Sequence, residues 1–206
     1  MRIFKPAQRK NLSQCPSFNK PLLAGEMTID NLLEFAAETG FEGVDLTGYY
    51  FPGYPAVPSD EYIYHVKQKA FNLGLGICGS GVKNDFTYPD PEKRAAEKRL
   101  VKDWIEVTSK LGGQTLRIFS GKGISEGYTW EQTAEWIAAT IRECAEYARQ
   151  HGVMLALQNH NDFLKTADQV QTLLKKVNSG WVGLMLDIGQ IEENYRRICL
   201  SWLSSY

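Results

Sequence analysis

The chain has 206 residues, of which 43% are hydrophobic and 23% are charged, and its formal net charge at pH 7 is −1. This near-neutral charge gives no electrostatic reason to expect nucleic acid or an anionic membrane as a partner. The sequence has no apolar run of about 18 residues, so it predicts no transmembrane helix. Residues 1–6 are basic but lack an apolar signal core, so we expect a cytoplasmic protein. An open alternative is that a signal peptide was removed beforehand.

Strand-like and helix-like segments alternate along the chain. Short runs rich in apolar residues predict strands, and apolar residues that recur every three or four positions predict helices. Strands are expected at residues 10–17, 43–47, 74–80, 114–120, 153–159 and 182–187. Helices are expected at residues 29–39, 60–73, 92–111, 130–151 and 167–177. This alternation predicts an α/β fold with a parallel sheet and right-handed crossovers.

Local signals mark several of the expected helix ends. Thr129 and Thr166 are each followed three residues later by a glutamine, which is the spacing of a capping box. In such a box the threonine accepts from an otherwise unpaired backbone N–H, and the glutamine accepts from the threonine backbone. Gly112 follows the helix expected at 92–111, where a C-cap glycine is common.

Two closures of the sheet are compatible with this pattern. One is an open doubly wound sheet, and the other is a (β/α)8 barrel. No GxGxxG or GxxxxGK[ST] motif follows any expected strand, and residues 121–123 (Gly-Lys-Gly) lack the remaining spacing, so we interpret them as a turn. The missing phosphate loop argues against a doubly wound nucleotide-binding fold and favours the barrel.

The cysteines and the main charged stretch are interpreted as structural features. Cys15, Cys78, Cys144 and Cys199 are too far apart for a CxxC pair, so we expect reduced thiols. Glu97 lies four residues after Lys93 and three after Arg94, so on a helix it can pair with either. With the signs mixed in this way, we interpret residues 92–99 as a solvated helix face and not as a nucleic-acid patch.

Polar side chains follow the fifth and sixth expected strands, at the point where each apolar run stops. Gln158 and His160 come after the fifth run, and Asp187 comes after the sixth. The carboxyl ends of parallel strands meet at one edge, so these side chains can face a common point. The alternatives are that Asp187 caps a helix and that His160 orders the following turn.

Further candidates lie on the fourth strand and after the second and third strands. Arg117 interrupts an apolar strand, and it either binds substrate or pairs with a neighbouring acid. Asn84 and Asp85 follow the third strand and either contact substrate or form a turn. Residues 49–55 are rich in aromatic side chains, which either cover a sugar at the barrel mouth or pack on the helices below.

Six short motifs occur in a fixed order between about residues 12 and 189. They are residues 17–20 (SFNK), 40–46 (GFEGVDL), 84–86 (NDF), 116–121 (LRIFSG), 157–160 (LQNH) and 186–189 (LDIG). Together they resemble the sugar phosphate isomerase/epimerase family of xylose isomerase-like TIM barrels. The resemblance implies a single (β/α)8 TIM-barrel domain over residues 1–206, with about six βα units present and the C-terminal part incomplete.

The resemblance also implies a divalent metal, Mn, Mg or Zn, at the C-terminal mouth of the barrel. The family's ligands are a Glu ending the fifth strand, an Asp ending the sixth, and a later His and Glu. The first two positions fall on Gln158 and Asp187, and the Glu at the first position is also a catalytic base in the family. A His that often follows the Asp by three residues is Gln190 here. Arg117, His160, Asn84 and Gln190 are the expected substrate contacts.

These departures predict an impaired enzyme of sugar isomerase/epimerase type. A glutamine can ligate a metal through its carbonyl, but it is neutral and is no base near neutral pH. The expected partner is a small sugar or polyol. The sequence leaves open whether the chain forms a homo-oligomer. The alternatives are a non-catalytic carbohydrate-binding barrel and a metal-dependent nuclease at abasic sites. The three histidines and the net charge of −1 argue against the nuclease.

Overall fold

A computed structural model of the protein describes residues 12–14, 18–160 and 163–187. Within these ranges six parallel strands form one sheet, and their order in the sheet is their order along the chain. The strands are β1 (Leu12–Gln14), β2 (Gly43–Thr47), β3 (Gly76–Gly81), β4 (Thr115–Phe119), β5 (Met154–Gln158) and β6 (Val182–Met185). A doubly wound sheet reverses its strand order at a switch point. The unbroken order therefore excludes that closure and confirms the predicted TIM-barrel type.

Helices occupy the connections between the strands. They are α1 (Asn19–Leu23), α2 (Ile29–Glu38), α3 (Asp60–Asn72), α4 (Pro91–Leu111), α5 (Trp130–Gln150), α6 (Ala167–Val177) and the short 3-10 helix η2 (Gly48–Tyr50). The five predicted helices are confirmed to within one residue at each end, and strands β2 to β6 to within two. β1 is shorter than the predicted strand 10–17, part of which lies outside the described residues. α1 and η2 were not predicted, because elements this short carry no periodic pattern.

The helix ends have the predicted caps. The Thr129 hydroxyl accepts from the Gln132 backbone N–H at 3.2 Å, and the Gln132 carbonyl accepts from the Thr129 N–H at 2.9 Å. Thr166 forms the same reciprocal pair with Gln169. Gly112 ends α4 with φ 85°, a conformation that side chains with a Cβ rarely adopt.

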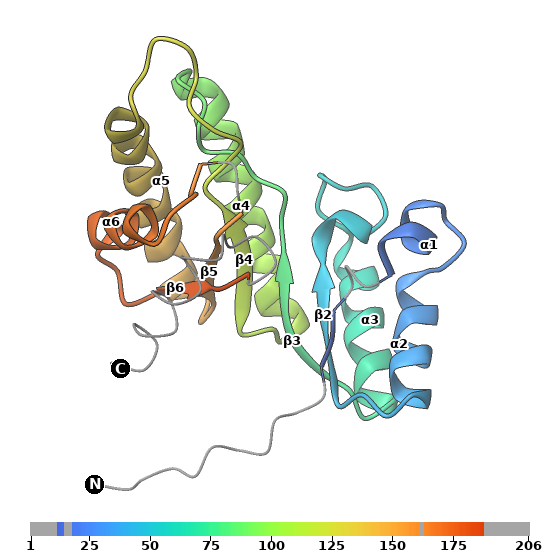
Figure 1. Ribbon diagram of the computed structural model, residues 1–206. Coiled ribbons are helices and arrows are strands. Elements are labelled where there is room, and N and C mark those ends of the chain that lie inside the picture. Colours follow the sequence, from blue (N-terminus) through green and yellow to red (C-terminus); the bar gives the residue numbers. More distant parts are fainter. Residues whose placement is uncertain (1–11, 15–17, 161–162, 188–206) are drawn as a thin grey trace, which may run out of the picture.

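The helices and the two faces of the sheet divide the molecule into a core and a polar inner surface. In Figure 1, α2 to α6 follow one another around the sheet, and each packs against the next. Leu155 and Leu157 are fully buried in the core with these helices, whereas the alternate residue Gln158 is only half-buried. Val44 and Asp45 show the same contrast on β2. Because side chains alternate across a strand, the polar groups share the face opposite the helices. Among the described residues, no helix has the length and apolar character that crossing a membrane requires.

Lys93 and Arg99 are exposed, as expected of a solvated helix face, but the predicted partner of Glu97 is wrong. The Glu97 side chain is half-buried, and its Oε2 accepts from the backbone N–H of Asp85 at 3.0 Å. Burial raises the pKa of the Glu97 carboxyl above its ordinary value. The Arg94 guanidinium instead donates to the Tyr88 carbonyl at 2.5 Å. A backbone N–H in the loop after β3 needs a hydrogen-bond acceptor. Glu97 supplies this acceptor, so its carboxylate does not pair with a cation on its own helix.

Two of the cysteines, Cys78 and Cys144, lie in the described residues, and Cys144 is a free thiol. Cys144 is fully buried on α5, and burial raises the pKa of its thiol to about 12. Cys78 is half-buried on β3. Cys144 agrees with the expected reduced state, while Cys15 and Cys199 lie outside the described residues.

Candidate functional site

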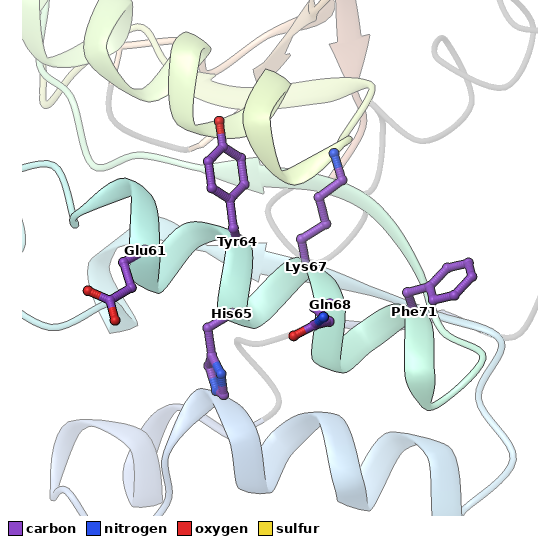
Figure 2. Close-up of a pocket in the computed structure, with 6 residues that line it drawn as sticks. All are labelled: Glu61, Tyr64, His65, Lys67, Gln68 and Phe71. Atoms are coloured by element: carbon purple, nitrogen blue, oxygen red, sulfur yellow. The ribbon is translucent and has the colours of Figure 1, made fainter.

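One hollow is a shallow groove on the outer surface of α3. Figure 2 shows the six side chains that line it, all of them exposed and all from this one helix. Tyr64 and Lys67 reach toward α4, where the Lys67 ammonium donates to the Lys110 carbonyl at 2.9 Å. Phe71 remains 81% exposed. A site needs polar groups that converge from several elements, so this groove is an outer helix surface.

A smaller cavity of about 270 Å³ lies at the C-terminal ends of the strands. It is lined by Asp45, Thr47, Tyr49, Arg117, Phe119, Gln158, His160, Met185 and Asp187. These residues come from β2, β4, β5 and the chain just beyond them, and from the end of β6. Chemistry in TIM barrels is placed at this end of the strands. The cavity is therefore the candidate site.

Arg117 occupies the centre of the cavity because its neighbours on the sheet are small. In the strand register it lies between Gly81 of β3 and Ala156 of β5. A Cβ atom on Gly81 would lie 2.6 Å from Nη2 of Arg117, so the guanidinium rests directly on the β3 backbone. The side chain is 6% exposed. Two small neighbours thus let one long cationic side chain cross the inner face.

The Arg117 guanidinium joins the two sides of the cavity by hydrogen bonds. Its Nη1 donates to the Gln158 Oε1 at 3.2 Å, and its Nη2 donates to the Tyr49 hydroxyl at 3.2 Å. The guanidinium also lies 4.8 Å from the ring centroid of Phe119 and 5.8 Å from that of Tyr49. Aromatic faces attract a cation at these distances. The Arg117 guanidinium is therefore held in place by Gln158, Tyr49 and Phe119.

The Gln158 side chain has one orientation that suits both of its neighbours. Its Nε2 donates to the Asp187 Oδ2 at 2.8 Å while its Oε1 accepts from Arg117. The reversed amide would point N–H groups at a guanidinium and an oxygen at a carboxylate. Asn159 holds the same junction, because its side chain accepts from the Asp187 backbone N–H at 2.7 Å and donates to the Asp187 carbonyl at 3.2 Å.

Asp45 is a cavity residue that the sequence reasoning missed. Its Oδ1 is buried and has no hydrogen-bond partner among the described residues. Burial raises the pKa of the Asp45 carboxyl above its ordinary value of 3.8, and the positive charge of Arg117 opposes that rise. Thr47, two positions along β2, also has a buried hydroxyl without a partner in the described residues. The available signal was an acid at an alternate position between the apolar residues Val44 and Leu46.

The structure brings some predicted site residues together and not others. Arg117, Gln158, His160 and Asp187 all line the cavity, and the His160 ring packs edge-on to Phe119 at 5.4 Å. Asn84 does not line the cavity. Its amide makes two hydrogen bonds to the backbone of Phe119, at 2.7 and 2.9 Å, and so joins the ends of β3 and β4. Gln190 lies outside the described residues.

The aromatic side chains of the loop at 49–55 do not all have the same role. The sequence left open whether they face the cavity or pack on the helices below, and both occur. Tyr49 faces the cavity. Phe51 and Tyr54 instead pack against Trp104 of α4, with ring centroids 5.5 and 5.6 Å from it. One ring of the loop is thus available to a ligand, and two hold the loop on the helix below.

The cavity does not fit a divalent metal as it is arranged. Gln158 and Asp187 would have to turn oxygen atoms toward one ion, but the Gln158 N–H group points at the Asp187 carboxylate. Within residues 12–14, 18–160 and 163–187, no three His, Cys, Asp or Glu side chains form a group that could hold a metal ion. The fixed positive charge at this centre is the guanidinium of Arg117.

Comparisons with known proteins agree with this architecture. The family model described as "Xylose isomerase-like TIM barrel" matches residues 33–197. The chain is 24% identical over 178 residues to an inosose dehydratase of Mesomycoplasma hyopneumoniae, covering 82% of this chain and 56% of that protein. It is 25% identical to the D-psicose 3-epimerase from Clostridium cellulolyticum H10, solved with D-tagatose, with a TM-score of 0.67 and coverage of 80% and 60%.

A third similar structure is the IolI protein with a bound zinc atom. It is 16% identical to this chain, with a TM-score of 0.69 and coverage of 85% of this chain and 61% of that one. At this identity the likeness shows the fold alone. The chain spans less than two thirds of the length of each of these three relatives.

Proposed function

The chain belongs to the xylose isomerase-like TIM barrel family, and on that premise we propose that its cavity binds a sugar or a sugar-like polyol in a site of isomerase/epimerase type. The names of its relatives, a D-psicose 3-epimerase and an inosose dehydratase, support a ligand of this chemistry. The observation that carries the proposal is the convergence of hydrogen-bonding groups and an aromatic ring at the strand ends.

The lining of the cavity suits a ligand with many hydroxyl groups. Arg117 and Tyr49 can donate hydrogen bonds, while the carboxylates of Asp45 and Asp187 can accept them. The Tyr49 and Phe119 rings offer apolar faces on which the C–H surface of a sugar can pack. A cavity of about 270 Å³ is close to the lower size limit for small-ligand sites. These features favour a monosaccharide-sized ligand.

Proton transfer next to a carbonyl is the step that this chain performs poorly. That step needs a base within hydrogen-bond reach of the carbon acid, and a general base contributes about 10²–10⁴-fold to the rate. The Gln158 amide has no basic atom, and both of its polar ends are engaged by Arg117 and Asp187. A bound divalent metal would polarise the substrate carbonyl in the family's chemistry, but the described residues do not fit one. We therefore propose binding with strongly reduced turnover.

A non-catalytic carbohydrate-binding barrel is the second candidate function. The hydrogen bonds that link Tyr49, Arg117, Gln158 and Asp187 favour it, because they engage both polar ends of the Gln158 side chain. The two candidates differ in turnover and share the ligand, so one set of measurements separates them.

The first prediction is that sugar binding does not depend on a metal. We expect isothermal titration calorimetry to give the same affinity for D-psicose or D-tagatose in EDTA and in excess Mn²⁺, because Arg117 supplies the fixed positive charge. Chromatography of the same sugars after incubation should show interconversion at least about 10²-fold slower than with Gln158→Glu. No binding of either sugar would contradict the proposed function.

The Gln158→Glu variant has a matched control at the other end of the sheet. Gln114 precedes β4 and is exposed, so Gln114→Glu makes the same chemical change away from the cavity. A second carboxylate beside Asp187 should raise Mn²⁺ affinity by about tenfold or more, whereas Gln114→Glu should leave it unchanged. Equal Mn²⁺ affinity in the wild type and Gln158→Glu would contradict the assignment of Gln158 and Asp187 to the family's ligand positions.

The second prediction concerns the glycine under Arg117. Gly81→Ala should weaken D-tagatose binding by about tenfold or more, since a Cβ there would lie 2.6 Å from Nη2 of Arg117 and would displace the guanidinium. The atoms displaced belong to the far end of a flexible side chain, so the free energy of unfolding should change by no more than about 1 kcal/mol. Calorimetry and urea denaturation measure the two effects.

Alanine substitutions at two other glycines serve as controls for Gly81→Ala. A Cβ on Gly180 would meet no atom within 4 Å, so Gly180→Ala should change neither quantity. Gly79→Ala would bring a Cβ to 2.4 Å from the Thr115 backbone oxygen, so it should destabilise the sheet itself. Unchanged sugar affinity in folded Gly81→Ala would show that the position of Arg117 does not matter for binding.

A further inference from the structure

Asp45 is the one acid of the cavity with a buried oxygen that lacks a hydrogen-bond partner in the described part of the chain. Leaving a buried polar atom unpaired destabilises a fold, so an atom of this kind calls for an explanation. The carboxyl faces the cavity from the middle of β2, and Thr47 lines the cavity two residues further on. The two side chains share a strand face because the side-chain period of a strand is two.

No side chain in the described ranges donates to the buried oxygen of Asp45, so a ligand hydroxyl can fill this place. The charge of Arg117 acts on the Asp45 carboxyl, but the guanidinium donates its hydrogen bonds to Gln158 and Tyr49. In the strand register Thr47 lies opposite Gly81, and Gly81 lies opposite Arg117. The guanidinium that crosses Gly81 therefore comes close to β2. An acceptor on β2 and a donor that arrives from β4 are thus presented side by side.

This arrangement complements two neighbouring oxygen atoms of a polyol. One ligand hydroxyl can donate to Asp45, while the adjacent oxygen accepts from Arg117. The charges of the lining point to a neutral ligand. The carboxylates of Asp45 and Asp187 oppose the single guanidinium of Arg117, which leaves a formal charge of −1 with His160 neutral. An added phosphate or carboxylate would meet this excess of negative charge at short range.

We propose that Asp45 is a specificity-determining residue of the cavity, which accepts a hydrogen bond from a ligand hydroxyl and selects neutral polyols over phosphorylated ones. The inference rests on the proposed function, since it names the class of sugar that the same site takes. The proposal explains why a carboxylate stands at a position where packing of the fold does not require a charge. An asparagine of the same shape would fill the position with less desolvation of charge.

The test compares D-tagatose with D-tagatose 6-phosphate by isothermal titration calorimetry. The wild type should bind the neutral sugar at least tenfold more tightly than the phosphate. Asp45→Asn should lose about tenfold or more in affinity for D-tagatose, and its preference for the neutral sugar should shrink at the same time. A role limited to packing would not change the ratio of the two affinities.

One control variant and one further variant separate the role of Asp45 from other effects on binding. Asp168→Asn removes an exposed carboxylate from α6 and should leave both affinities unchanged. Thr47→Val keeps the shape of the side chain and should weaken D-tagatose binding without altering the preference over the phosphate. Unchanged binding of both sugars by Asp45→Asn would overturn this inference alone. Failure of the wild type to bind either sugar would overturn the proposed function and this inference with it.

Discussion

Replacing Trp104 with alanine is expected to lower the free energy of unfolding by about 3–5 kcal/mol, the range for a fully buried aromatic residue. Trp104 is 0% exposed on α4, and its ring packs against Phe51 and Tyr54 of the loop after β2. The cavity left behind is too large for the surrounding rings to fill. Urea denaturation followed by circular dichroism measures the loss.

The effect of Trp104→Ala should extend to the candidate site. A Cβ on Gly48 would lie 2.7 Å from the Trp104 ring, so the indole lies directly against the turn that carries Tyr49. Loss of the indole should therefore free Tyr49 from its contact with Arg117 and weaken D-tagatose binding as well. Phe71→Ala is the control, because this ring is 81% exposed and its removal should change stability by less than about 0.5 kcal/mol. Equal stability of the two variants would contradict the described packing.

Replacing Arg117 with methionine should have the largest effect on the site. We expect D-tagatose affinity to fall by about 100-fold, which corresponds to about 2.7 kcal/mol. Gln158 and Tyr49 each lose a hydrogen-bond donor, and the ligand loses the fixed positive charge. The free energy of unfolding at pH 7 should fall by about 1–3 kcal/mol, the range for buried polar groups left without partners. Arg99→Met, on the exposed side of α4, is the matched control.

The same variant should change how stability depends on pH. Burial raises the pKa of Asp45 above 3.8, and Arg117 opposes that rise. Without the guanidinium the folded-state pKa should rise further, so the folded state holds more protons than the unfolded state between 3.8 and that raised value. Under this condition the free energy of unfolding decreases as pH increases through the window. Arg117→Met should therefore be closest to the wild type in stability near pH 4 and furthest from it at neutral pH.

A double variant isolates the contribution of Asp45 to this pH dependence. Combining Arg117→Met with Asp45→Asn removes the carboxyl that titrates, so the added slope between pH 4 and 7 should disappear. Urea denaturation at several pH values gives the comparison. A slope that persists in the double variant would assign the pH dependence to another group and would contradict the coupling between Asp45 and Arg117.

Much of the fold follows from local sequence patterns. The capping boxes at Thr129 and Thr166, and the helix-ending Gly112, involve residues only a few positions apart, so their interactions can be read along the chain. The alternation of strands and helices then predicts a parallel sheet. The polar residues Gln158 and Asp187 mark the edge of the sheet where the candidate site lies, because each one ends an apolar run.

The errors and omissions arise where the outcome depends on distant residues. Glu97 was assigned to neighbours on its own helix, but the loop after β3 supplies the donor it contacts, the Asp85 backbone N–H. Asn84 was assigned to substrate, but its amide is engaged by the backbone of Phe119 on the next strand. In both cases a buried backbone group required a partner, and the sequence does not reveal which side chain is within reach.

The sequence by itself determined the order and type of the elements and the end of the sheet at which polar groups gather, because periodicity and capping act over a few residues. Only the tertiary structure decided how the cavity works. The register of three strands places Gly81 beside Arg117, and this lets the guanidinium cross the inner face to Tyr49. The same fold half-buries Asp45 at the cavity wall, and burial depends on neighbours that the sequence does not place.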